Sequence, residues 1–90
     1  MGIDYDKDSE ILKTLGHPLR LRIVECLMSD ECNVNKIINI FNIPQSTVSQ
    51  HLGILKSKGI VVVRKEGVRR CYKVSDKRIG RIIKILKQKV

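Results

Sequence analysis

Long apolar runs are missing from this sequence. No segment offers 18 consecutive apolar residues, so we expect no membrane-spanning helix. The acidic residues near the start, Asp4, Asp6 and Asp8, argue against a signal peptide, because such peptides begin with a basic segment. At 90 residues we expect one small cytoplasmic domain that spans positions 1–90.

Aromatic residues and cysteines are also few. The chain has no Trp, one Phe, two Tyr and three Cys. An odd number of cysteines in a cytoplasmic protein argues against a framework of disulfides. Packing or sensing is then their expected role.

Catalytic motifs are absent as well. The sequence contains no glycine-rich phosphate loop and no His-Glu-x-x-His pattern. Ser49 and His51 stand two residues apart on a segment that we expect to be helical, so their side chains point in different directions. We therefore expect neither enzyme activity nor a cofactor.

Acidic residues become rare after residue 31. The first 31 residues carry seven acidic and four basic side chains, whereas residues 32–90 carry two and fourteen, and the whole chain has a net charge of +9. Positive charge concentrated in one segment predicts a polyanionic partner. Double-stranded DNA is the partner that we expect, and an anionic membrane surface is the competing polyanion.

Residues 44–55 combine an apolar helical stripe with a polar face. Val48, Leu52 and Leu55 have the i, i+4, i+7 spacing that anchors one side of a helix in a core. Pro44 suits the first helical turn, where an N–H would have no partner within the helix. The polar face consists of Gln45, Ser46, Thr47, Ser49 and Gln50. Such side chains can bond base edges in the major groove, so the segment predicts a DNA-reading helix. A helix surface that is only solvated is the alternative.

Residues 60–74 form two β-branched segments around Gly67, which predicts a hairpin. Alternation along its strands places Cys71 on the exposed face and three residues on the face toward the core: Val68, Tyr72 and Val74. Four basic residues flank the turn: Arg64, Lys65, Arg69 and Arg70. Such a hairpin can lay cations along DNA phosphates or into a minor groove, while the alternative is a solvated turn.

Other helices are expected before the reading helix, which itself ends at Lys58 and Gly59. Their expected positions are about 6–15, from His17-Pro18 onward, and 34–41 with Asn33 as the N-cap. Asn42 and Ile43 make a tight turn into the reading helix. Two short helices joined in this way form a helix-turn-helix, and the hairpin makes it winged. The predicted fold is thus mainly α with a β-hairpin.

The last segment, about residues 76–90, has apolar residues at helical spacing and basic residues elsewhere. In so small a domain we expect this helix to pair with its copy and with the first helix of a second subunit. The residues assigned to this homodimer contact are Ile11, Leu12, Leu15, Ile79, Ile82, Ile83 and Leu86. Packing within one chain is an alternative. A helix lying on a membrane is another, which the lack of Trp and Phe in this segment disfavours.

Four blocks of the sequence occur in the order and spacing of a known family: 15–24, 45–52, 55–61, and 64–67 with Tyr72. From about residue 9 to its end, the chain resembles the ArsR/SmtB family of bacterial repressors. The resemblance implies a winged helix-turn-helix homodimer that binds an inverted-repeat operator and releases it when an inducer is sensed. It also implies that the polar residues of the reading helix contact DNA and that the hairpin arginines flank it.

The sensing residues of that family are missing here. Its soft-metal sensors carry two cysteines where the aligned positions hold Asn33 and Asn35, and amides are poor ligands for soft metals. Residues 79–90 contain neither a histidine nor an acidic residue for zinc. The family's pair of redox cysteines has no counterpart either, since Cys26 lies one position off and the last helix has no cysteine. We therefore expect no metal site.

The cysteines leave one sensor hypothesis. We expect Cys26 in the core, and Cys32 and Cys71 are then the candidate thiol sensors, since Arg69 and Arg70 would lower the thiol pKa of Cys71. Three inert cysteines are the alternative, and the inducer itself stays unknown. The other class of function that we keep open is a basic module that binds DNA without sequence choice or binds other proteins.

Overall fold

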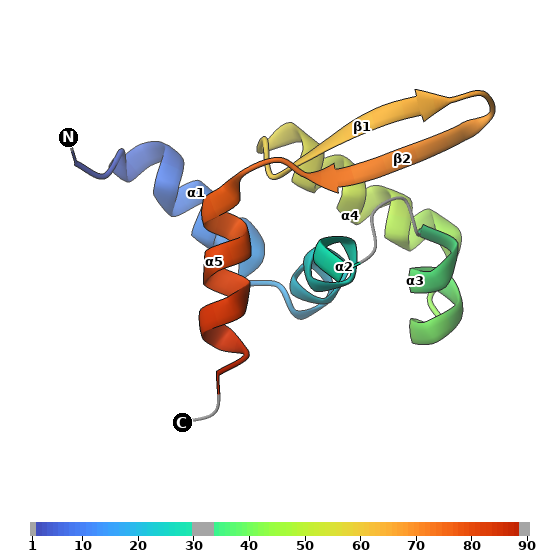
Figure 1. The fold of residues 1–90 in the computed structure, drawn as a ribbon, viewed down its shortest axis with the longest axis horizontal. Helices are drawn as coiled ribbons and strands as arrows, with labels where there is room; N and C mark the ends of the chain where they lie inside the picture. The colour runs from blue at the N-terminus through green and yellow to red at the C-terminus, as the bar shows by residue number, and fades with distance from the viewer. Residues whose placement is uncertain (1, 30–33, 89–90) are drawn as a thin grey trace.

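The computed structural model describes residues 2–29 and 34–88, with the backbone alone at Arg69. Within these ranges the chain is mainly helical with one hairpin (Figure 1), which confirms the predicted winged helix-turn-helix. The elements are α1 (Tyr5–Leu15), α2 (Pro18–Ser29), α3 (Val34–Phe41), α4 (Gln45–Ser57), β1 (Val61–Glu66), β2 (Arg69–Val74) and α5 (Lys77–Leu86). Each helix in the described ranges is too short or too polar to cross a bilayer.

Asn42 builds the turn between α3 and α4. Its φ of 51° lies in the left-handed region, which Asn tolerates better than most residues. The N–H of Ile43 then donates to the carbonyl oxygen of Ile38 at 3.3 Å and closes the end of α3. This confirms the predicted tight turn. The predicted N-cap of α3, Asn33, lies outside the described residues.

The start of α4 differs from the prediction by one residue. Pro44 has a helix-like φ of −56° but an extended ψ of 142°, so the helix begins at Gln45. The carbonyl oxygen of Pro44 accepts from the N–H groups of Thr47 at 3.0 Å and Val48 at 3.2 Å. The prediction used the fixed φ of proline, and this angle does not determine ψ.

Gly59 ends α4 as predicted. Its φ is 73°, a region that glycine enters without steric strain. The N–H of Gly59 donates to the carbonyl oxygen of Lys56, and that of Ile60 to the carbonyl oxygen of Leu55, both at 3.0 Å. This is the hydrogen-bond pattern of a Schellman motif. It leads the chain directly from α4 into the hairpin.

The hairpin is antiparallel with a two-residue turn. Gly67, with a φ of 61°, takes the first turn position, where other L residues are strained. Val61 stands opposite Val74 in the register, and both pack on the core together with Tyr72. The prediction for Val68 is wrong, since its side chain is fully exposed (103%). Val68 lies in the turn, beyond the paired residues that rest on the core.

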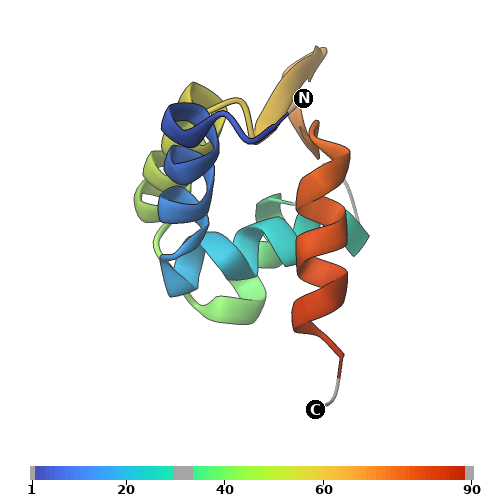
Figure 2. The same cartoon turned by 90° about the vertical axis from the view of Figure 1, so that its left-hand side faces the viewer.

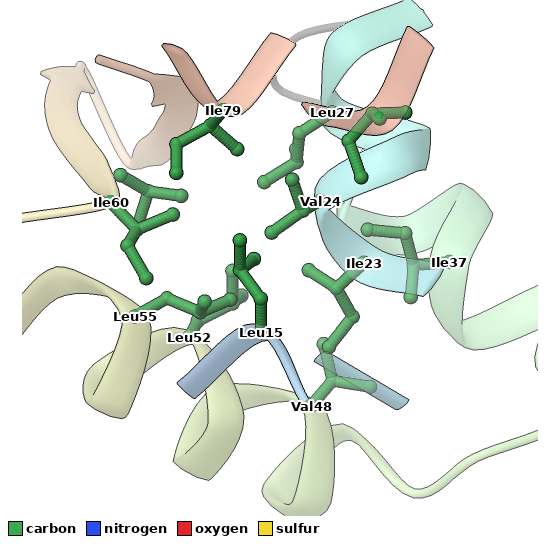
Figure 3. Close-up of a cluster of buried hydrophobic side chains, with 12 residues drawn as sticks. Leu15, Ile23, Val24, Leu27, Ile37, Val48, Leu52, Leu55, Ile60 and Ile79 are labelled. Atoms are coloured by element: carbon green, nitrogen blue, oxygen red, sulfur yellow. The ribbon is translucent and has the colours of Figure 1, made fainter. Parts of the chain in front are cut away.

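Buried aliphatic side chains from the helices and the base of the hairpin form one cluster (Figure 3). From α4 the cluster takes Val48, Leu52 and Leu55, as the helical spacing predicted. Its other members are Leu15, Ile23, Val24, Leu27, Ile37, Ile60, Val61, Ile79 and Ile83. Helix α4 is therefore fixed along one side, and its other side is left to solvent.

α1 and α5 both lie at the end of the molecule opposite the hairpin tip (Figure 1), and the view of this end in Figure 2 shows them standing apart, α1 on the left and α5 on the right. Arg78 on α5 forms ion pairs with Asp8 on α1 at 3.1 Å and with Asp76 at 2.8 Å. Asp76 is also the N-cap of α5, since its carboxylate accepts from the N–H of Arg78. The hydrogen bonds from Arg78 lower the pKa of Asp76. This network ties the first helix to the last.

Candidate nucleic-acid interface

Helix α4, the predicted reading helix, presents its polar residues on the side away from the core. The side chains of Gln45, Ser46, Ser49 and Gln50 are exposed, and that of Thr47 is half-buried. Their positions are fixed because the opposite side of the helix is packed in the cluster of Figure 3. An α-helix fits the major groove, where amide and hydroxyl groups can bond base edges.

The N-terminus of α4 is open to an anion. Among the described residues, no side chain caps this end of the helix. The first N–H groups of a helix and its dipole both favour negative charge. Gln45 and Ser46, which stand at this end, are exposed. A DNA phosphate is an anion that this end could hold.

Two of the predicted hairpin cations lie near its tip, on the same strand face as the residues that pack on the core. Lys65 and Arg70 stand opposite each other in the register, and both side chains are exposed. The backbone of Arg69 pairs with that of Glu66, and the side chain of Arg69 lies outside the described part of the structure. Lys65 and Arg70 therefore expose two positive charges on the same face of the hairpin.

Arg64 has a different environment. Its guanidinium pairs with the carboxylate of Glu66 at 2.7 Å and also donates to the sulfur of Cys71 at 3.6 Å. An acidic neighbour reduces the charge that Arg64 can offer to DNA. We therefore expect Arg64 to contribute less to phosphate binding than the sequence alone indicates.

An apolar groove of about 200 Å³ separates α1 from α5. Its lining includes Ile3, Ile11, Leu12, Ile79 and Ile82. Three of the residues assigned to a dimer contact are instead buried in the chain's own core: Leu15, Ile79 and Ile83. Helical spacing alone does not tell which of two apolar partners a residue will meet. Ile11 and Ile82 are half-buried, while Leu12 and Leu86 are exposed, so these four remain candidates for a contact between subunits.

A sequence profile described as bacterial regulatory protein, arsR family, matches residues 17–63. This chain belongs to the ArsR family. It is therefore a DNA-binding transcription regulator, and since the family is not enzymatic, the prediction that the chain is not an enzyme is confirmed. The matched residues span the helix-turn-helix and the first half of β1.

Relatives of known structure share the whole fold. The transcriptional repressor PagR of Bacillus anthracis is 43% identical over 86 residues, which cover 93% of this chain and 85% of PagR, and its crystal structure superposes with a TM-score of 0.80. HlyU from Vibrio cholerae has a TM-score of 0.86 at 30% identity, covering 96% of this chain and 94% of HlyU. The homodimeric winged helix-turn-helix domain of Mb0332 from Mycobacterium bovis has a TM-score of 0.81 at 27% identity, covering 96% and 84%.

Cys71 of this ArsR-family protein is buried and disulfide-bonded, so two sequence-based expectations are wrong. Its side chain is 3% exposed, although alternation placed it on the exposed face of the hairpin. The odd number of cysteines favoured free thiols, yet Cys71 carries no thiol to ionise here. A count of cysteines does not reveal which of them the fold brings into reach of another. The second candidate sensor, Cys32, lies outside the described residues.

The described ranges hold no group of three or more His, Cys, Asp or Glu that could bind a metal ion. Asn35 lies exposed on α3, and Asn33 is outside these ranges. Cys26 is a free thiol at the edge of the core rather than within it. Burial and the neighbouring carboxylate of Glu25 raise its pKa. A raised pKa leaves less of the reactive thiolate, so Cys26 is a poor sensor.

The structure also reveals a polar cluster that sequence reasoning missed. Arg20 on α2 has its Nη1 atom 3.4 Å from Nδ1 of His51 on α4, and its Nε donates to the carbonyl oxygen of Thr14 at 2.7 Å. The rings of His17 and His51 lie 4.8 Å apart. His17 also opens α2, because its Nδ1 accepts from the N–H of Leu19 at 3.1 Å. The sequence indicated only that His17, a polar residue before Pro18, would lie at the start of a helix. It gave no sign that His17 would lie next to His51.

Proposed function

We propose that this protein is a repressor that binds an inverted-repeat operator as a homodimer. In each subunit α4 enters the major groove, and Gln45, Ser46, Thr47, Ser49 and Gln50 contact base edges and phosphates. The hairpin follows the adjacent phosphate backbone with Lys65 and Arg70. The observation that carries this proposal is the exposed polar side of a helix whose other side is locked in the core. Such rigidity suits base recognition, because a bidentate contact needs a defined geometry.

A homodimer is part of the proposal because each chain carries one reading helix. Two copies related by a two-fold axis place two such helices one turn of DNA apart, and they then match an inverted repeat. The apolar groove between α1 and α5, at which Leu12 is exposed, is the surface that a second copy would cover, and Leu86, exposed on α5 beside a separate groove against α2, would extend this contact. The similar Mb0332 domain is a homodimer, and the similar PagR is a repressor.

Selection from random-sequence duplexes tests this function. We expect an imperfect palindrome with half-site centres about ten base pairs apart. The selected duplex should bind about a thousandfold more tightly than random DNA at the same salt concentration. A basic module without sequence choice, the alternative function, would enrich no duplex and would show a ratio near one.

We also propose that the redox state of Cys71 regulates operator binding. Reduction would take two electrons and two protons from a dithiol and convert the disulfide into two thiols. Because Arg64 donates to the sulfur of Cys71, a change at this sulfur would alter the cations of the hairpin. Reduced protein and protein treated with peroxide or tetrathionate should then differ about tenfold or more in operator affinity.

Three serine variants make this test specific. Cys71→Ser and Cys32→Ser should abolish the response to oxidant, whereas Cys26→Ser, which removes the free and less reactive thiol, should keep it. Zinc, cadmium and arsenite should not release the operator, because Asn33 and Asn35 stand where the soft-metal sensors of the family carry cysteines. Equal affinity of the reduced and oxidised proteins would refute the redox proposal. Release by stoichiometric metal would refute the expectation that no metal is sensed.

A further inference from the structure

Arg20 contacts the imidazole of His51. A guanidinium has only hydrogen-bond donors, so the approach at 3.4 Å requires Nδ1 of His51 to accept. The imidazole is then neutral, with its proton on Nε2. Arg20 also donates to the carbonyl oxygen of Thr14 at the end of α1, and this second bond at 2.7 Å holds the guanidinium in place. A proton on Nδ1 of His51 would therefore face a fixed cation and remove the acceptor.

His17 closes the other side of the cluster. Its ring lies 4.8 Å from that of His51, and its Nδ1 is already used by the N–H of Leu19. His17 therefore has no acceptor at Nδ1 to offer a protonated His51. Arg20 thus joins α2 to the end of α1, and the neutral imidazole of His51 joins both to the middle of α4.

We infer that Arg20 is a positioning residue for DNA recognition. Through neutral His51, it holds the turn of α4 that carries Ser49 and Gln50. Protonation of His51 releases this hold and lowers operator selectivity. This inference rests on the proposed function, since it concerns the helix that reads DNA. Neither Arg20 nor His51 needs to touch the operator. The reading residues and the residues that orient them are then separate groups.

The pKa of His51 agrees with a neutral imidazole in this cluster. Burial lowers the pKa of His51 from its usual 6.5, and His17 and Arg20 lower it further. The other charged groups on elements near α4 are Glu10 on α1, which pairs with Lys58 at 3.4 Å, Lys36 on α3, and Arg64, Lys65 and Glu66 on β1, where Arg64 pairs with Glu66 at 2.7 Å. A lowered pKa means that the hydrogen bond between Arg20 and His51 is intact above about pH 6.5 and breaks as the pH falls through the lowered pKa of His51.

A pH series from 7.0 downward through the titration of the His51 ring, which its imidazole NMR shifts locate, tests the inference, because His17 and His51 are the only two histidines in the chain. In the native protein we expect the affinity ratio between the selected duplex and random DNA to fall about tenfold over this range. His51→Asn offers an uncharged acceptor to Arg20 and should bind with a nearly flat pH profile. Arg20→Gln should lower the ratio already at pH 7.0. Arg22→Gln, which changes an exposed arginine on the same helix, should behave like the native protein.

Amide and imidazole NMR shifts of the DNA-free protein give a second readout. The amides of residues 49–53 should titrate together with the His51 ring in the native protein and not in His51→Asn. A flat pH profile of the native protein on its selected duplex, or a His51 ring that titrates without those amides, would overturn the inference. If selection enriches no duplex, the proposed function fails, and the NMR titration still decides whether His51 controls α4.

Discussion

Leu12→Glu is expected to make the protein monomeric and to weaken binding to the full operator by about a thousandfold. Leu12 is 59% exposed at the apolar groove between α1 and α5, so a second copy that covers this groove would bury the new charge. Burying an unpaired carboxylate costs several kcal/mol. Without the dimer, each subunit would bind a single half-site. Sedimentation equilibrium and operator titration measure the two effects.

Ile40→Glu is the matched control. Ile40 is an apolar residue of nearly equal exposure, 57%, but lies on α3, away from the groove. This variant should remain a dimer. Leu86→Glu should repeat the effect of Leu12→Glu from the other helix. Ile83→Glu would be a poor test, since Ile83 is only 6% exposed within its own chain and a charge there would disrupt the fold. A Leu12→Glu protein that sediments as a dimer would contradict the proposed interface.

Gln50→Ala and Arg70→Ala are expected to weaken operator binding in different ways. Removing a bidentate hydrogen bond to a base should cost about 1–3 kcal/mol in each half-site and relax the preference at one base pair. Arg70→Ala should weaken binding to specific and random DNA alike. It should also reduce the salt dependence by about one unit for each phosphate that Arg70 neutralises in the native complex. Both residues are exposed, so neither change should unfold the protein.

Lys73→Ala provides the control for charge. Lys73 is also an exposed cation on β2, but its register position opposite Val62 places it on the other face of the hairpin from Arg70. Lys73→Ala should therefore weaken binding to specific and random DNA less than Arg70→Ala does. If Gln50→Ala weakened binding to specific and random DNA equally, α4 would not be the element that reads bases.

Local features of the fold followed from the sequence alone. The spacing of Val48, Leu52 and Leu55 predicted which side of α4 is buried, and Gly59 predicted where the helix ends. Asn42 predicted the turn before it. Such features depend on backbone dihedral preferences and on helical periodicity, which short segments carry by themselves. The error at Pro44 is of the same local kind, since a proline ring fixes only one of the two dihedrals.

The candidate site was predictable in part for the same reason. Periodicity identified the exposed polar residues of α4, and composition identified the basic hairpin. Alternation failed for Val68 and for Cys71. It tells which residues share a face of a strand, but the burial of that face depends on what packs against it.

Composition, periodicity and turn residues thus determined the order of the elements, the polar face of α4 and the positive charge of its surroundings. The tertiary structure decided that Ile79 and Ile83 fill the chain's own core while Leu12 and Leu86 stay exposed. It also brought Arg20 and His51, 31 positions apart, within hydrogen-bond distance. These outcomes depend on surfaces contributed by distant segments, and a pattern within one segment contains no information about the partner that will cover it.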